Sequence, residues 1–307
     1  MKRIVCICLL FVQITLLSVS FAQKSNLSQH PLKRNAEIRY GQLDNGLTYY
    51  IWPNKVPKGE AVYRLWLKSG SLNEEVDQLG IAHFLEHMAF NGTKNFPGKD
   101  LLEYLQRHGV KFGANVNAYT SIDETVYNIS DVPTDPVAHP NIVDSCLLIL
   151  HDWSGYISLL DEEIDNERGV IHEEWRSRNG AQQRMLETIL PKLLPDNRYN
   201  DRMPIGKKAG ENHLAVVDDF KYEELRDYYK KWYRPDLQAI IVVGDVNVDD
   251  IEKRIINGFS DIKMPENAAR FEADEDLLNE EPIYVIDKDK EQQQVVLELM
   301  FKHEAFP

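Results

Sequence analysis

The sequence predicts an α+β fold of layered sheet and helices. Short stretches with the composition of strands alternate along the chain with longer stretches of helical periodicity. No glycine fingerprint of a doubly wound nucleotide-binding sheet accompanies them, which favours an α+β layer architecture over a Rossmann-like one. A chain of 307 residues is also long enough to build a large apolar core.

The first 22 residues have the pattern of a signal peptide. Lys2 and Arg3 precede an apolar run, and Ser20 and Ala22 place small residues where a signal peptidase cleaves. Because the run is short for a membrane span, we expect export without stable membrane insertion after cleavage. An uncleaved N-terminal anchor is the alternative.

Net charge and cysteine content indicate which partners the protein can bind and whether disulfides stabilise it. The formal net charge is −14, and removal of Lys2 and Arg3 would bring it to −16 (−14 − 2). Such an acidic chain without a basic stripe argues against nucleic acid as a partner. Two of the three cysteines lie in the signal segment, so Cys146 has no disulfide partner and we expect it to be a small buried apolar residue.

The elements can be assigned in order from residue 37. A hairpin comes first, with strands at 40–43 and 47–52 around the turn Asp44-Asn45-Gly46. The remaining assignments are strands at 61–68 and 124–129, helices at 101–108, 143–156, 161–178 and 248–259, and further ordered stretches at 220–233 and 237–246.

These elements suggest a domain layout. Residues 23–263 would form an N-terminal domain, and the polar, acidic residues 264–282 would form a linker. Residues 283–307 would begin a second, truncated domain, with strands at 283–286 and 294–301.

The stretch from Gly80 to Phe90 carries the most specific chemical signal. Its apolar residues recur with the spacing of one buried helix face. His83 and His87, four residues apart, can point at a common atom, as zinc-binding histidines do. Glu86 beside them can act as the proton acceptor for an attacking water, in the order H-x-x-E-H. The alternative is an amphipathic helix whose histidines merely sit at the edge of the core.

Two histidines leave a catalytic zinc site one protein ligand short. The acid-rich helix predicted at 161–178 can supply a carboxylate from a distant part of the chain. Most of its acids are expected on a solvated face, and spacing alone does not single out the ligand.

Four segments, in this order, resemble the pitrilysin/insulinase family of zinc metallopeptidases, and specifically a bacterial exported branch of it. They are residues 80–93 around the H-x-x-E-H pattern, Asn117-Ala118-Tyr119-Thr120-Ser121, Glu124-Thr125-Val126-Tyr127, and residues 167–176. Residues 229–246 also match the end of the family's first repeat unit. The resemblance implies an α+β domain of the pitrilysin/mitochondrial-processing-peptidase type, followed by the start of a second similar domain.

The resemblance also implies roles for individual residues. His83 and His87 would be zinc ligands and Glu86 the catalytic base. The family's third ligand, a Glu, falls on Asp165, whose shorter side chain requires a closer approach of its helix; Glu162 is the rival for this role. Asn115, Asn117, Ala118 and Tyr119 would belong to an edge strand that binds the substrate's main chain.

The implied function is zinc-dependent endopeptidase activity, with one Zn²⁺ per catalytic domain, on peptides or unfolded polypeptide segments. The implied location is the periplasm or cell surface of a bacterium. A missing C-terminal half of the same protein would complete the substrate chamber. A non-catalytic peptide-binding or scaffolding member of the same fold is the alternative, as is, more weakly, a metal-binding export protein without hydrolase activity.

Overall fold

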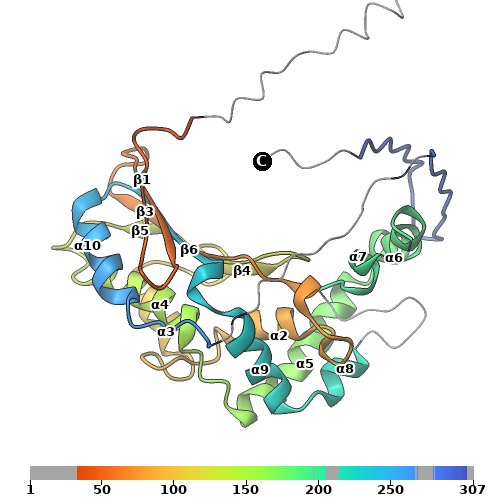
Figure 1. The fold of residues 1–307 in the computed structure, drawn as a ribbon, viewed down its shortest axis with the longest axis horizontal. Helices are drawn as coiled ribbons and strands as arrows, with labels where there is room; N and C mark the ends of the chain where they lie inside the picture. Colours follow the sequence, from red (N-terminus) through yellow and green to blue (C-terminus); the bar gives the residue numbers. More distant parts are fainter. Residues whose placement is uncertain are drawn as a thin grey trace, which may run out of the picture. The chain divides into compact units, whose positions relative to one another are not determined.

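The fold is built on one mixed six-stranded sheet, shown with its helices in Figure 1. The structure, a computed structural model, describes residues 33–195, 197–204, 214–266, 268, 279 and 281–302. The predicted signal peptide, 1–22, lies outside the described residues, as does most of the predicted linker. The spatial order of the strands is β1 (Arg39–Gln42), β2 (Thr48–Pro53), β6 (Gln238–Gly244), β3 (Glu60–Leu67), β5 (Thr125–Pro133) and β4 (Val116–Thr120).

Local sequence patterns explain the pairing. The turn at Asp44-Asn45-Gly46 joins β1 and β2 as the predicted antiparallel hairpin, and Gly46 adopts the positive φ that such a turn needs. Strand β6 pairs parallel to β2 and antiparallel to β3, so a strand from late in the chain closes the middle of the sheet. Residues 238–244 therefore join the β1–β2 hairpin to strands β3, β5 and β4.

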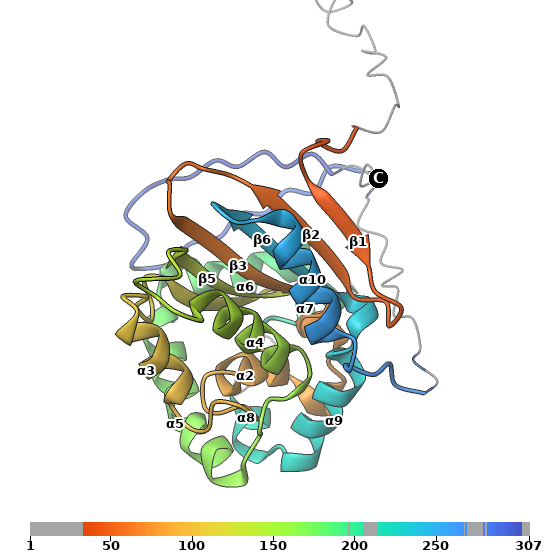
Figure 2. The ribbon, with the colours of Figure 1, turned by 90° about the vertical axis from the view of Figure 1, so that its left-hand side faces the viewer.

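Helices cover one face of the sheet, as Figure 2 shows for α4 (Ile142–Gly155) and α10 (Val248–Phe259). Alternation along β3 explains this arrangement, because Tyr63, Leu65 and Leu67 are fully buried whereas Arg64 between them is exposed. The remaining helices are α2 (Ile81–Met88), α3 (Asp100–Arg107), α5 (Asp161–Arg178), α6 (Ala181–Leu193), α7 (Arg198–Asp201), α8 (Ala215–Asp219) and α9 (Tyr222–Trp232). The α+β prediction is confirmed.

The predicted strands at 283–286 and 294–301 are not formed. Residues 281–302 have no regular secondary structure, and the side chains of Val295, Leu297 and Phe301 are largely exposed. A strand needs a neighbouring strand to complete its hydrogen bonds, and none of the described residues provides one here. This segment is instead anchored to α6, where Arg184 pairs with Asp289 and Glu291.

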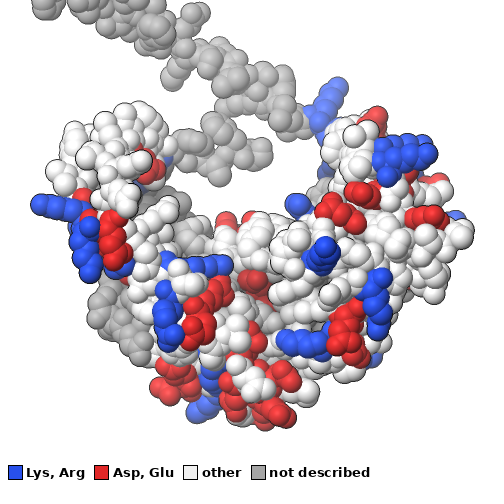
Figure 3. All heavy atoms as spheres, turned by 180° about the vertical axis from the view of Figure 1, so that it is seen from behind, with Lys and Arg blue, Asp and Glu red and all other residues white. Residues whose placement is uncertain are grey.

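The surface carries mixed charge. On the face shown in Figure 3, acidic and basic side chains lie next to one another. Among the described residues, no helix has both the length and the apolar character needed to cross a membrane.

Candidate metal and catalytic centre

Helix α2 carries the H-x-x-E-H residues into the middle of the helical layer. Ile81, Phe84, Leu85 and Met88 are buried at the predicted spacing and fix the helix against its neighbours, which include α5, α9 and strand β4. His83 and His87 consequently share an adjacent face, and their Nε2 atoms lie 3.3 Å apart.

Helix α5 presents its own inward face to α2. Ile164, Glu167 and Ile171 are buried on it, and Glu174 continues the stripe, so the four residues follow a spacing of 3, 4 and 3. The two apolar residues pack into the core, and the two carboxylates between and beyond them point towards α2. This face therefore delivers Glu167 and Glu174 to the histidine pair.

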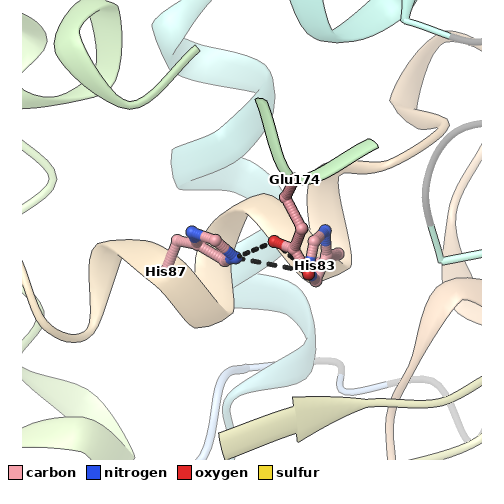
Figure 4. A group of neighbouring side chains, drawn as sticks. All are labelled: His83, His87 and Glu174. Atoms are coloured by element: carbon pink, nitrogen blue, oxygen red, sulfur yellow. Dashed lines mark hydrogen bonds and ion pairs between the residues drawn. The ribbon is translucent and has the colours of Figure 1, made fainter. Parts of the chain in front are cut away.

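The cluster brings together His83, His87 and Glu174 (Figure 4). Glu174 Oε2 lies 3.0 Å from His87 Nε2 and 3.5 Å from His83 Nε2, and one donor atom from each residue lies within 4.8 Å of the others. Zinc bonds of about 2.0–2.1 Å in a tetrahedral arrangement separate neighbouring ligand atoms by roughly 3.3 Å. Two imidazoles and one carboxylate at these separations fit a catalytic zinc site, which leaves a fourth position open.

The charges of the cluster depend on one another. Burial lowers the pKa of His83 to about 4. Burial would also lower the pKa of His87, but hydrogen bonds to Glu167 and Glu174 outweigh it and raise that pKa to about 9. The same hydrogen bond from His87 lowers the pKa of Glu174 to about 2. Burial and the hydrogen bonds between these side chains therefore set their pKa values jointly.

Glu167 supports the cluster from outside it. Its Oε1 lies 2.8 Å from His87 Nδ1, and its Oε2 accepts a hydrogen bond from Asn91, three residues beyond the end of α2. Lys99 in turn donates to the Asn91 side-chain oxygen. A carboxylate on the second ring nitrogen fixes the orientation and tautomer of a metal-binding histidine. Sequence reasoning missed this role for Glu167.

Glu86 lies on α2, between the two histidines, and is placed for proton transfer. It is nine-tenths buried, and its Oε2 accepts a hydrogen bond of 2.8 Å from the Thr120 hydroxyl at the end of β4. Burial raises its pKa to about 7, although the Thr120 hydrogen bond opposes this shift. A carboxylate with such a pKa can both accept and return a proton near neutral pH.

Strand β4 lies at the edge of the sheet, as the family resemblance implies. Asn117, Ala118 and Tyr119 lie in it, and Asn115, just before it, bonds to Asp131 instead of facing the cluster. The carbonyl oxygen of Asn115 accepts a hydrogen bond from Ser130 N at β5, so every second residue from Asn115 turns its main-chain groups towards β5. Ala118 and Thr120 lie at the alternate positions, and their main-chain groups turn outward. None of the described residues pairs with these two outward positions.

The outer edge of β4 is closed at its start. Val116 also turns its main chain outward, but its N–H bonds to Lys111 and its C=O accepts from Gly113. Among the described residues, the outward main-chain groups of β4 that lack a backbone partner therefore lie at the end of the strand nearest Glu86.

The structure does not bring Asp165 or Glu162 to the histidine pair, where Glu174 lies instead. Asp165 is exposed and accepts a hydrogen bond of 2.7 Å from Tyr222, and Glu162 is exposed as well. Asp165 lies nine positions before Glu174, and nine steps of about 100° turn its side chain to the opposite face of α5. Glu174 occupies the place expected for Asp165.

Comparisons of this sequence with known proteins find similarity to zinc peptidases. Residues 49–203 match the model of the insulinase family, peptidase family M16, and residues 219–302 match that of the peptidase M16 inactive domain. The chain is 40% identical over 238 residues to the probable zinc protease PqqL of Escherichia coli, which covers 78% of this chain and 24% of that protein. It is 30% identical to the chloroplast stromal processing peptidase of Pisum sativum, over 72% of this chain and 16% of that protein.

The fold has a solved counterpart. The crystal structure of the first half of periplasmic PqqL from Escherichia coli superposes with a TM-score of 0.73 at 37% identity, covering 80% of this chain and 51% of that one. Measured against the full-length E. coli protein, and not its first half alone, the chain spans about a quarter of the relative's length.

Proposed function

Because this chain belongs to the insulinase family, peptidase family M16, we propose that it is the metal-binding, catalytic N-terminal portion of a zinc-dependent endopeptidase. The observation that carries the proposal is the convergence of His83, His87 and Glu174 beside the buried Glu86. A non-catalytic relative would have no need for a buried carboxylate next to such a site.

Three residues would hold the metal ion: His83 and His87 through Nε2, and Glu174 through its carboxylate. Bound zinc would supply the polarisation of a substrate carbonyl and the activation of water. Glu167 orients the His87 ring, so that Nε2 faces the site.

Glu86 would take the proton from the attacking water and pass it to the leaving amine of the substrate. The Thr120 hydroxyl holds the carboxylate in place during both transfers. Because Thr120 lies at the open end of β4, the proton acceptor and the proposed substrate strand meet at one residue.

The outward main-chain groups of Ala118 and Thr120 would bind an extended stretch of substrate as an added strand. Main-chain pairing reads backbone more than side chains, which suits peptides or unfolded segments of varied sequence as substrates. By analogy with the periplasmic PqqL structure, the place of action would be the periplasm or surface of a bacterium. Further parts of a longer protein would complete the substrate chamber.

The test is cleavage of a quenched fluorescent peptide library by the full-length protein and its Glu86→Gln variant, with zinc quantified in each. We expect Glu86→Gln to retain zinc and to lose about 10²–10⁴-fold in kcat. Glu103→Gln, at an exposed position of α3, serves as the matched control and should retain full activity.

Two outcomes would contradict the proposal. If the wild type and Glu86→Gln both bind zinc and neither cleaves any peptide, the protein is a non-catalytic member of the fold. If neither contains zinc, the metal assignment is wrong.

A further inference from the structure

The segment Gly70–Glu74 joins β3 to the loop before α2 and is buried along its whole length. It is fixed to the turn that follows β4: Ser71 donates its N–H to Ser121 O over 3.2 Å, and Leu72 donates to Ile122 O over 2.7 Å. The approach is so close that a Cβ on Gly70 would lie 2.3 Å from the Ser121 carbonyl oxygen. This segment is therefore held directly beside the open end of the edge strand.

At the other end of the segment, the side chain of Glu74 reaches the start of α2. Glu74 is completely buried, and its two oxygens accept separate backbone hydrogen bonds, 3.0 Å from Gly80 N and 2.8 Å from Ala82 N. The first N–H groups of a helix have no partner within it, and the residue that precedes α2, Gly80, has no side chain to cap them. Glu74, eight residues before Ala82, supplies the acceptors.

The main chain of Glu74 is itself immobilised. Its carbonyl oxygen accepts a bond of 2.9 Å from Arg202 Nε and one of 3.3 Å from Arg198. Arg198 also donates to Leu72 O, and Ser71 Oγ donates to the backbone of Arg202. Both guanidinium groups thus donate to backbone carbonyls of this segment, while the two carboxylate oxygens of Glu74 accept from the main chain at the start of α2.

We propose that Glu74 is a positioning residue for catalysis: it ties the start of α2 to the segment that also carries the turn after β4. One rigid connection thereby sets the separation between Glu86 on α2 and Thr120 on β4. The proposal rests on the function proposed above, in which Glu86 and the edge strand must meet at the same peptide bond.

The test compares Glu74→Gln and Glu74→Asp with Glu75→Gln in the full-length protein. Glutamine keeps the size but retains one acceptor oxygen, and aspartate keeps both oxygens one methylene farther away. Glu75 is an exposed neighbour that pairs with Lys231, so its substitution is the matched control. The measurements are kcat and KM on a cleaved peptide, zinc content, the visible absorption of the Co²⁺-substituted protein, and amide hydrogen exchange of the peptide covering residues 80–88.

We expect Glu74→Gln to keep its zinc, to lose about 10–100-fold in kcat and to change KM by less than about threefold, since small displacements of catalytic groups cost this much. Hydrogen exchange should rise in residues 80–88 alone, and the Co²⁺ bands should shift. Glu74→Asp should fall between Glu74→Gln and the wild type, and Glu75→Gln should match the wild type.

Unchanged kcat and exchange in Glu74→Gln would overturn the proposal. So would faster exchange over the entire chain with a normal Co²⁺ spectrum, because that pattern describes loss of folding stability alone. If the wild type cleaves nothing, the proposed function fails, while the exchange of residues 80–88 and the Co²⁺ spectrum still decide the role of Glu74.

Discussion

The two ends of helix α2 are each held by a buried carboxylate, and the two carboxylates do different work. At the start, Glu74 accepts two backbone N–H groups. At the end, Glu167 contacts one ring nitrogen of His87 and the amide of Asn91. The first therefore fixes where the helix lies, and the second fixes how one histidine on it is turned.

The pKa values of Glu74 and Glu167 also shift in opposite directions. Burial raises the pKa of Glu74 to about 8. Burial also acts to raise the pKa of Glu167, but the hydrogen bonds from His87 and Asn91 outweigh it, and the pKa is lowered. A neutral backbone partner suits a positional role, whereas a titrating partner couples Glu167 to the proposed metal site.

The largest loss of zinc affinity is expected from a substitution in the cluster of His83, His87 and Glu174. Glu174→Gln removes the negative charge of the proposed third ligand, so zinc affinity should fall by more than about 100-fold, beyond the usual cost of losing a group that only supports a ligand. Competition with a chromogenic chelator measures this directly.

Asp165→Asn is the matched control for that experiment. Its side chain is on the opposite face of α5, where it accepts a hydrogen bond from Tyr222, and zinc affinity should be unchanged. A loss of zinc in Asp165→Asn with retention in Glu174→Gln would restore Asp165 as the ligand.

The contrast between the two ends predicts a smaller, separable effect. Glu167→Gln should weaken zinc binding by about 10–100-fold, because His87 loses the partner that orients its ring. Glu74→Gln should retain zinc and lose kcat instead. Equal zinc affinities in the two variants, measured by the same chelator competition, would show that Glu74 and Glu167 do not differ in this way.

The smallest effect concerns stability against pH. Because the pKa of Glu74 is raised in the folded protein, the folded state holds a proton that the unfolded state has released, between about pH 4.5 and pH 8. The contribution of Glu74 to stability should therefore decrease as pH rises through this window. Urea unfolding at pH 5 and pH 8 should show a smaller decrease in Glu74→Gln than in the wild type, and equal decreases would contradict the raised pKa.

Much of this architecture could be predicted from the sequence, because local patterns determine it. The helix at 161–178 begins and ends where its charge and apolar pattern predict, and the hairpin follows from Asn45-Gly46. The strands predicted after residue 282 do not form, since strand formation depends on partners that local sequence does not reveal.

The sequence-based prediction did not place Glu174 beside the histidine pair, although the sequence held a usable signal for it. Ile164 and Ile171 mark the inward face of α5, and Glu167 and Glu174 lie on the same stripe whereas Asp165 does not. Applying the helical period to the apolar residues would have selected the two glutamates. The bonds from Glu74 to Gly80 and Ala82 are different, because a carboxylate folding back across a turn leaves no periodic signal.

The short open edge of β4 also limits how far two copies of the chain could pair through this strand. An exposed sheet edge can recruit the same edge of another copy and so begin aggregation. Here Lys111 and Gly113 occupy the outward groups of Val116, so only Ala118 and Thr120 remain accessible along this strand among the described residues. Two residues offer few main-chain hydrogen bonds to another copy, whereas the proposed substrate strand would also be held by the neighbouring metal centre. A short edge of this kind disfavours self-association through β4 at the place proposed for the substrate strand.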